Sequence, residues 1–172
     1  PWTARRIYET ALEWAAPEPE ARALDLYCRV GPLSLSLATR AAFVVGIEES
    51  PRAIADARAN QRRNRRYNLR FEQGDAAAAI ARLGATIGAI DIVTLNPTRK
   101  GASTVVLEAI AAAHPRRIVY VSCEPRTLAR DLERLAELGY RTARVRLFDM
   151  LPQTEHVEAV SLLVPRGHAE DV

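Results

Sequence analysis

The chain has few cysteines, few aromatic residues and no long apolar run. Two cysteines in 172 residues are too few for a disulfide scaffold or a four-ligand zinc site. No apolar run is long enough to span a bilayer, and residues 1–17 have the pattern of an amphipathic helix, which differs from a secretory signal peptide. These absences predict a cytoplasmic globular protein with two free thiols and no bound metal.

Lysine is almost absent as well, since Lys100 is the only one and the other cations are arginines. The net charge of +3 and the pI of about 9.2 permit nucleic-acid binding without requiring it. The densest basic segment runs from Gln61 to Tyr67, at the end of a predicted helix. Two interpretations stay open for it: a solvated helix end, where cations favour the helix dipole, or a patch that contacts phosphates.

Apolar runs alternate with helical segments along most of the chain, after a short linker-like stretch at 17–20. Strands are predicted over 23–27, 43–47, 68–72, 89–95, 117–122, 141–147 and 156–164, and helices over 1–17, 33–40, 51–64, 75–83, 103–113 and 125–138. This alternation predicts an α/β fold with a doubly wound, mostly parallel seven-stranded sheet. The last two strands have no helix between them, so they form an antiparallel hairpin at one edge. Ligands of such sheets lie beyond the carboxyl ends of the strands.

Cys123 directly follows an apolar run and directly precedes a helix that starts with proline. It therefore lies at the carboxyl end of a buried strand, where a thiol is presented as a nucleophile. Cys28 also follows a strand, but a small core residue is the simpler interpretation. Glu158 alternates with apolar neighbours early in the last strand. It is either a general base that faces Cys123 or a solvent-facing residue, and nearby His156 is interpreted as structural or exposed.

The ends of the first three strands suggest a nucleoside site. The first turn holds one glycine, Gly31, where a dinucleotide site needs several. Glu48 ends the second strand roughly 20 residues downstream, where an acidic residue suits a ribose with free hydroxyls. This favours a nucleoside cofactor without phosphates over NAD, although Asp25 and Glu48 could simply cap loops. Asp75, after the third strand, caps the next helix or hydrogen-bonds an adenine amine.

The fourth strand ends in a polar turn, Asn96-Pro97-Thr98-Arg99-Lys100-Gly101. A polar residue at a strand end, a turn restricted by proline and two bases can hold a planar ring and a nearby phosphate. An ordinary turn also uses Asn-Pro, so both interpretations stay open.

These segments, in this order, resemble the catalytic domain of the S-adenosylmethionine-dependent RNA uracil-5-methyltransferases. The resemblance runs from about Thr3 to about Val164, and its most specific segments are Tyr120-Val121-Ser122-Cys123-Glu124-Pro125-Arg126-Thr127-Leu128-Ala129-Arg130-Asp131 and Asp149-Met150-Leu151-Pro152-Gln153-Thr154-Glu155-His156-Val157-Glu158. It implies a class I, Rossmann-like methyltransferase domain over residues 19–166, an N-terminal helix over 1–18 that leads into it, and a tail over 167–172.

The resemblance also implies a mechanism and a set of site residues. Cys123 would be the nucleophile that attacks carbon 6 of uracil, and Glu158 the base that removes the carbon 5 proton. The RNA partner would be ribosomal RNA or tRNA. Family members usually carry an N-terminal RNA-binding domain, which we expect in the parent protein. S-adenosylmethionine would lie on Tyr27, Gly31, Glu48, Asp75 and Asn96, and the substrate on Asn96 and Arg99.

The chain departs from the family pattern at three positions. Arg29 stands where the family usually has glycine, and a side chain there disfavours a positive φ. Asn96 replaces an aspartate, which removes a charge at the substrate. Glu124 replaces an asparagine beside the nucleophile, where a carboxylate would disfavour the thiolate. An impaired, methyltransferase-like pseudoenzyme or RNA-binding module is therefore the alternative.

Overall fold

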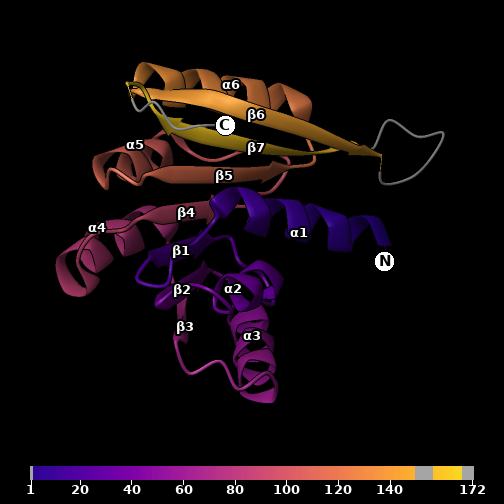
Figure 1. The fold of residues 1–172 in the computed structure, drawn as a ribbon, viewed down its shortest axis with the longest axis vertical. Coiled ribbons are helices and arrows are strands. Elements are labelled where there is room, and N and C mark those ends of the chain that lie inside the picture. Colours follow the sequence, from indigo (N-terminus) through magenta and orange to yellow (C-terminus); the bar gives the residue numbers. More distant parts are fainter. Residues whose placement is uncertain (1, 150–156, 168–172) are drawn as a thin grey trace.

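The computed structural model describes residues 2–149 and 157–167, without the side chains of Trp2 and Thr3 (Figure 1). Strands and helices alternate from residue 22 to residue 137, as the sequence predicts. The strands are β1 (Arg22–Leu26), β2 (Phe43–Glu48), β3 (Leu69–Gln73), β4 (Ile92–Leu95), β5 (Arg117–Ser122), β6 (Tyr140–Asp149) and β7 (Val157–Pro165). The helices are α1 (Trp2–Ala15), α2 (Pro32–Leu37), α3 (Pro51–Arg63), α4 (Ala76–Ile87), α5 (Thr104–Ala112) and α6 (Pro125–Glu137).

The seven strands form one sheet in the order β3-β2-β1-β4-β5-β7-β6 (Figure 1). The first five strands in this order are parallel, whereas β7 is antiparallel to both β5 and β6. This confirms the predicted doubly wound, mostly parallel sheet with an antiparallel hairpin at one edge. The chain reverses its direction of winding between β1 and β4, which is where open α/β sheets bind ligands.

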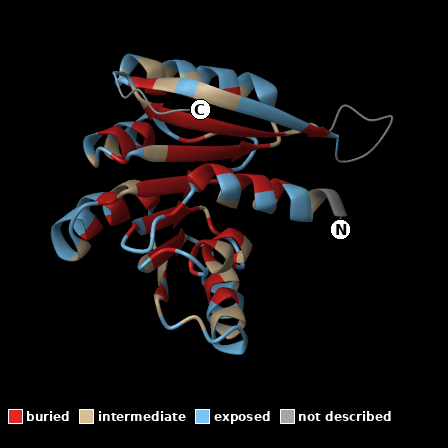
Figure 2. Ribbon diagram, in the orientation of Figure 1, coloured by how far each residue is buried: buried red, intermediate tan, exposed pale blue. Residues whose placement is uncertain are grey.

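Helices cover both faces of the sheet, and buried side chains fill the strands and the inward sides of the helices (Figure 2). One core lies between the sheet and α1, α2 and α3, and includes Ile7, Leu37 and Ile54. The second core lies between the sheet and α4, α5 and α6. Neighbouring strand residues alternate between the two cores, because successive side chains of a strand point to opposite faces.

The helices start within one residue of the predicted positions, while some of their ends differ, as for α2, which ends at Leu37 instead of residue 40. Ser50, Asp75 and Ser103 each accept a hydrogen bond from the backbone N–H three residues later, which is the geometry of an N-cap. The boundary between α4 and β4 differs from the prediction, which had the helix end at residue 83 and the strand begin at residue 89. In the structure, α4 continues to Ile87 and β4 begins only at Ile92. Gly88 ends the helix with a φ of 82°.

Helix α1 packs on β5 and β7, so the N-terminal segment belongs to the core of the described structure. Its Trp14 is buried, and the Arg146 guanidinium from β6 lies 5.4 Å from the centre of that ring. Within residues 2–149 and 157–167, no helix has both the length and the apolar character needed to cross a bilayer.

Candidate active site at the carboxyl edge of the sheet

The register of β5 and β7 places Cys123 and Glu158 at the same edge of the sheet. Ser122, the last residue of β5, pairs with Ala159 of the antiparallel strand β7. Cys123 is the first residue after β5, and Glu158 is the residue of β7 just before Ala159. Two groups that lie 35 positions apart in the sequence are therefore both located at the carboxyl edge.

Glu158 is partly buried, and this changes its acidity. Burial raises the pKa of the Glu158 carboxyl above its usual range, while the positive charge of Arg29 opposes that rise. A carboxyl whose pKa lies closer to neutrality is a better proton acceptor and donor than an exposed one. Arg29, which stands where the family usually has glycine, thus acts on the pKa of the candidate base through its positive charge.

Cys123 lines an open hollow of about 710 Å³ at the start of α6. Three cations line the same hollow: Arg99 and Lys100 from the turn after β4, and Arg126 from α6. The free thiol is partly exposed, in contrast to Cys28, which is buried at 4% exposure. Glu124 lines the hollow too, so the reachable thiol lies among three positive charges and one carboxylate, and the excess of positive charge suits an anionic ligand.

Glu124, expected to disfavour the thiolate, has a local structural role. It is the N-cap of α6, and its Oε1 accepts a hydrogen bond from the Arg126 backbone N–H at 3.1 Å. The Ser122 hydroxyl accepts the Glu124 backbone N–H at 3.1 Å. The carboxylate is thus directed to the positive end of the helix, where a negative charge is stabilised. Its effect on the Cys123 thiolate stays a prediction.

The turn after β1 contains three residues with positive φ. Tyr27 has a φ of 58°, Arg29 of 53° and Gly31 of 81°. Arg29 therefore adopts the left-handed conformation for which the family uses glycine, a conformation that costs a non-glycine residue roughly 1–2 kcal/mol. Gly31 has a packing reason too, because a Cβ at this position would collide with the Phe71 ring from β3.

Glu48 and Asp75 lie at the ends of β2 and β3, as expected, and both bind backbone N–H groups. Glu48 accepts from the backbone N–H groups of Arg29 and Ser50, each at 3.0 Å. Asp75 caps α4 through the Ala78 N–H at 2.8 Å. The loop-capping interpretation is thus confirmed for Glu48, and the helix-capping interpretation for Asp75. A carboxylate has about four lone pairs, so each can still accept from a ribose hydroxyl or an adenine amine.

Tyr27 lies near these acidic groups. Burial, followed by the negative charges of Asp75 and Glu49, raises the pKa of Tyr27 to about 12. The acceptors at the ends of β1, β2 and β3 fit a nucleoside, and the first turn provides no glycine-rich phosphate cradle. The predicted cofactor residues Tyr27, Gly31, Glu48, Asp75 and Asn96 therefore stay candidates for a nucleoside site.

Asp25 is a buried acid to which the sequence assigned at most a loop-capping role. It is 2% exposed and accepts from the hydroxyls of Ser34 at 2.5 Å and Thr94 at 2.7 Å. Burial raises its pKa to about 6, although the Ser34 and Thr94 hydrogen bonds lower it. The signal for this role in the sequence was a single aspartate inside the apolar run 23–27. A charge buried in such a strand needs hydrogen-bond partners from elsewhere in the fold.

The turn that carries Asn96 and Arg99 follows β4, the strand between β1 and β5. The Asn96 backbone N–H bonds to the Leu26 carbonyl of β1 at 3.3 Å, and Leu95 pairs with Tyr120 of β5. Asn96 thus lies between the candidate nucleoside residues and Cys123. The basic segment 61–67 lies elsewhere, because α3 starts at the carboxyl edge and ends before β3 starts, at the amino edge.

Two sequence predictions concern metals and His156. Within the described part of the chain, no three His, Cys, Asp or Glu side chains gather in an arrangement that could hold a metal ion. His156 lies outside the described residues, as does most of the second segment that carries the resemblance.

Comparisons with known proteins agree with this geometry. Residues 3–166 match the family model described as tRNA (Uracil-5-)-methyltransferase. The chain belongs to this family. The predicted resemblance is thereby confirmed, and the family is one of RNA-modifying methyltransferases.

Individual relatives show how much of a family member the chain represents. It is 51% identical over 163 residues to an uncharacterized RNA methyltransferase of Geobacter sulfurreducens, covering 95% of this chain and 33% of that protein. It is 45% identical over 156 residues to the 23S rRNA (uracil(1939)-C(5))-methyltransferase RlmD of Pseudomonas putida, covering 91% and 34%. The chain thus spans about a third of the length of these two relatives.

A solved structure supports the same family assignment. The Pyrococcus abyssi tRNA (uracil-54, C5)-methyltransferase, in complex with S-adenosyl-L-homocysteine, superposes with a TM-score of 0.76 at 30% identity. The superposition covers 92% of this chain and 38% of that one. The magnesium protoporphyrin IX methyltransferase of Synechocystis, at 20% identity and a TM-score of 0.74, shares the fold. The class I methyltransferase fold predicted from the sequence is therefore confirmed.

Proposed function

We propose that this chain is the catalytic domain of an enzyme that methylates carbon 5 of a uridine in RNA. The observation that carries the proposal is the β5–β7 register, because a reachable thiol at Cys123 and a partly buried carboxylate at Glu158 flank its last pair, Ser122 and Ala159. A nucleophile and a base on one side of a planar ring are what the two-step substitution at carbon 5 requires.

Cys123 and Glu158 would act in sequence. The Cys123 thiolate forms a bond to carbon 6 of uracil, and the electron pair of the 5,6 double bond becomes nucleophilic at carbon 5. After methyl transfer, the Glu158 carboxylate removes the carbon 5 proton. The C–H electron pair then re-forms the double bond, and the bond between carbon 6 and sulfur breaks to release the Cys123 thiolate.

The methyl group would come from S-adenosylmethionine, whose sulfonium sulfur keeps the electron pair of the broken bond and leaves as S-adenosylhomocysteine. Glu48 would accept from the ribose hydroxyls and Asp75 from the adenine amine, while Tyr27 and Gly31 would line the first turn. The bound S-adenosyl-L-homocysteine of the Pyrococcus abyssi relative supports this class of ligand.

The turn after β4 would bind the substrate. The Asn96 side chain can accept from the uracil ring N–H and donate to a ring carbonyl, although it lacks the charge of an aspartate. Arg99 would contact a phosphate beside the target uridine, together with the other cations of the hollow. The uridine has to leave any stacked arrangement in order to reach Cys123.

The RNA target is a ribosomal RNA or a tRNA. Among the relatives, the Pseudomonas putida protein is named for uracil 1939 of 23S rRNA and the Pyrococcus abyssi protein for uracil 54 of tRNA. Recognition of one RNA would depend on an RNA-binding domain in the parent protein, because a net charge of +3 offers few phosphate contacts.

An impaired methyltransferase is the second candidate, and the strained backbone of Arg29 beside the nucleoside residues favours it. A covalent trap separates the two candidates. The full-length protein is incubated with S-adenosylmethionine and RNA that carries 5-fluorouridine, whose fluorine cannot be removed as a proton. The enzyme gives a denaturation-resistant adduct at Cys123, and Cys123→Ser gives none. Absence of an adduct, alongside an active relative that forms one, contradicts the proposal.

A further inference from the structure

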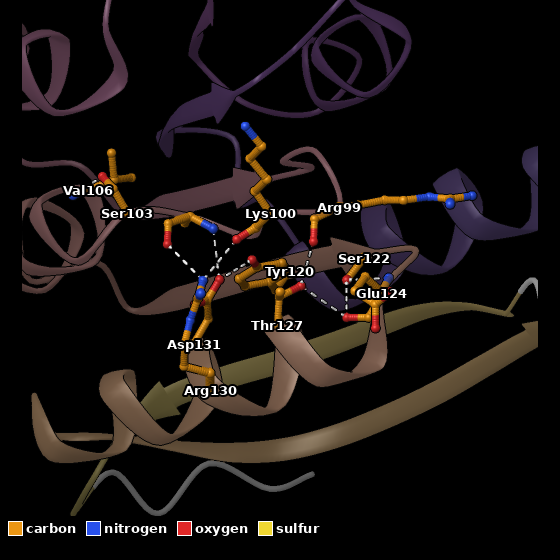
Figure 3. A network of polar contacts seen from close by, with 11 residues as sticks. Arg99, Lys100, Ser103, Val106, Tyr120, Ser122, Glu124, Thr127, Arg130 and Asp131 are labelled. Carbon is orange, nitrogen blue, oxygen red and sulfur yellow. Dashed lines mark hydrogen bonds and ion pairs between the residues drawn. The ribbon is translucent and has the colours of Figure 1, made fainter.

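Asp131 of α6 is a buried carboxylate at the centre of a polar network (Figure 3). It is 1% exposed. Its Oδ2 accepts from the Tyr120 hydroxyl at 2.6 Å and from the Ala102 backbone N–H at 2.8 Å. Its Oδ1 accepts from Arg130 Nε at 2.8 Å and Nη2 at 2.7 Å. One carboxylate thus joins three segments: strand β5, helix α6 and the loop after β4.

The loop is held from the same side by further contacts of α6. Arg130 Nη2 donates to the carbonyls of Lys100 at 3.0 Å and Ala102 at 3.3 Å, and Thr127 Oγ1 donates to the Arg99 carbonyl at 3.0 Å (Figure 3). These donors bind three of the four backbone carbonyls from Arg99 to Ala102. The carbonyl of the candidate substrate residue Arg99 is therefore one of the bonded groups.

Gly101 marks the closest approach of loop and helix. Its φ is +77°, and a Cβ added there would lie 2.5 Å from Asp131 Oδ2 and 2.6 Å from Arg130 Nη2. Only a residue without a side chain allows the Ala102 N–H to reach the carboxylate at this position. The close contact therefore depends on the glycine as well as on Asp131.

The network surrounds Cys123 along the chain. Tyr120 lies three residues before it, and Thr127, Arg130 and Asp131 lie four to eight residues after it. Burial and the hydrogen bond to Asp131 both raise the pKa of Tyr120, so its hydroxyl stays a donor. The segment that presents the nucleophile is consequently fastened on both sides to the loop that carries the candidate substrate residues.

We propose that Asp131 is a positioning residue, which holds the loop Asn96–Ala102 in register with Cys123 so that the uracil bound by the loop lies against the thiol. This inference rests on the proposed function. Stability alone does not account for a buried ionic group, because an apolar replacement of similar volume is often as stable. A buried carboxylate with several fixed donors instead specifies one arrangement of the segments that it joins.

The test compares two glycine-to-alanine variants of the full-length protein. Gly101→Ala adds a methyl group against Asp131, whereas Gly139→Ala adds one at a φ of +99° with nothing within 4 Å. Both variants strain a left-handed residue, so Gly139→Ala controls for lost stability. Asp131→Asn, which cannot accept at both oxygens, is the second test variant, in case Gly101→Ala does not fold.

Two quantities are measured for each variant: amide hydrogen exchange at Ala102, and the rate of adduct formation with 5-fluorouridine RNA at saturating S-adenosylmethionine. We expect Gly101→Ala and Asp131→Asn to accelerate the exchange and to slow the adduct about 10- to 100-fold, as small misplacements of reacting groups do. Gly139→Ala should change neither. S-adenosylmethionine affinity should match between Gly101→Ala and Gly139→Ala.

Two results would overturn the role of Asp131. One is an Ala102 amide that exchanges no faster in Gly101→Ala and Asp131→Asn than in Gly139→Ala. The other is faster exchange combined with an adduct rate equal to that of the control. An unsubstituted full-length protein that forms no adduct contradicts the proposed function itself, and so the two failures are distinguishable.

Discussion

The carboxyl edge of the sheet is built differently on the two sides of β4. On the cofactor side, formed by the ends of β1, β2 and β3, the candidate ligands are fixed by nearby backbone. Glu48 binds the N–H groups of Arg29 and Ser50, and Asp75 binds that of Ala78. On the substrate side, formed by the β4 turn, Cys123 and Glu158, the arrangement depends on contacts between segments far apart in sequence.

This difference has a consequence for substitutions. A change on the cofactor side should act on nucleoside affinity and on the local turn, while a change on the substrate side should act on the rate of the chemical steps. The two sides are held by separate sets of bonds, so the effects of substitutions should be largely additive, except at Arg29, whose charge acts on Glu158. The five predictions below start from this separation.

The largest effect is expected for Glu158→Gln, which removes the candidate base. Turnover should fall by about 10²- to 10³-fold while S-adenosylmethionine affinity stays unchanged. Because the carbon 5 proton cannot be removed, ordinary uridine RNA should accumulate as a denaturation-resistant adduct at Cys123. Gel electrophoresis of the reaction measures it. A loss of cofactor binding by this variant would contradict the separation of the two sides.

The same carboxylate predicts the pH dependence of turnover. Glu158 has to be deprotonated in order to act, and burial raises its pKa, so activity should fall with acid around a midpoint above the usual carboxyl range. A pH–rate profile under single-turnover conditions measures that midpoint, and it should disappear in Glu158→Gln.

The next effect concerns Asp25, which lies buried on the cofactor side. Its folded pKa of about 6 exceeds the usual value of 3.8, so the folded state binds the proton more tightly than the unfolded state. The stabilisation of the folded state by this tighter proton binding is fully present below pH 3.8 and is lost as the pH rises through about 6. A shift of about two pH units corresponds to roughly 3 kcal/mol.

Asp25→Asn should therefore remove this part of the pH dependence and make the protein more stable at neutral pH. Urea unfolding at several pH values between 4 and 7 measures the free energy of unfolding. The matched control is Asp56→Asn on the exposed side of α3, which should leave the dependence unchanged. Equal slopes for the natural sequence and Asp25→Asn would contradict the prediction.

A smaller effect is expected for Glu48→Gln. The amide has one acceptor oxygen, so one of the two backbone N–H groups of Arg29 and Ser50 loses its partner. S-adenosylmethionine affinity should fall by about tenfold, measured by calorimetry, because one hydrogen bond to a charged group contributes roughly 1.5–3 kcal/mol. Glu49→Gln changes the same charge on the exposed neighbouring residue and should bind normally. The adduct rate at saturating cofactor should stay unchanged in both.

The smallest effect is expected for Arg29→Gly. Glycine relieves a left-handed residue, a gain of roughly 1–2 kcal/mol, but adds flexibility to the unfolded chain, which offsets about 0.5–1 kcal/mol. Thermal unfolding should thus show a gain below about 1 kcal/mol. Arg65→Gly, at a φ of 51° on an exposed turn away from the site, should give a similar gain.

Only the Arg29 variant should also affect the site. The charge of Arg29 lowers the Glu158 pKa, so its removal should move the acid limb of the pH–rate profile to higher pH. If the natural sequence binds S-adenosylmethionine, the Arg29 side chain does not obstruct the cofactor. If only Arg29→Gly binds it, the Arg29 side chain is the substitution that impairs the enzyme.

Much of the fold and part of the site could be predicted from local sequence. The alternation of apolar runs and helices identifies the elements, and Asp75 caps α4, which is one of the two roles that the sequence suggests for it. Cys123 could be placed at a strand end because proline and a helical pattern follow it at once. These features depend on neighbours within a few residues, and the sequence displays such neighbours directly.

Other features depend on pairing across the chain. The two acids Asp25 and Asp131 were not predicted as network centres, because their partners, Thr94 and Tyr120 with the Ala102 N–H, come from other strands and loops. Gly31 was predicted from its possible cofactor role, whereas the collision with Phe71 supplies a packing reason that no local pattern contains.

By itself, the sequence determined the identity and order of the helices and strands, and the presence of a thiol and a carboxylate at strand ends. Tertiary structure alone decided that these two groups lie at the same edge of the sheet, beside the last pair of β5 and β7. It inserts β7 between β5 and β6, with Ser122 opposite Ala159. The physical reason is that strand order and register follow from burying both faces of the whole sheet, a condition that no single segment of the sequence can express.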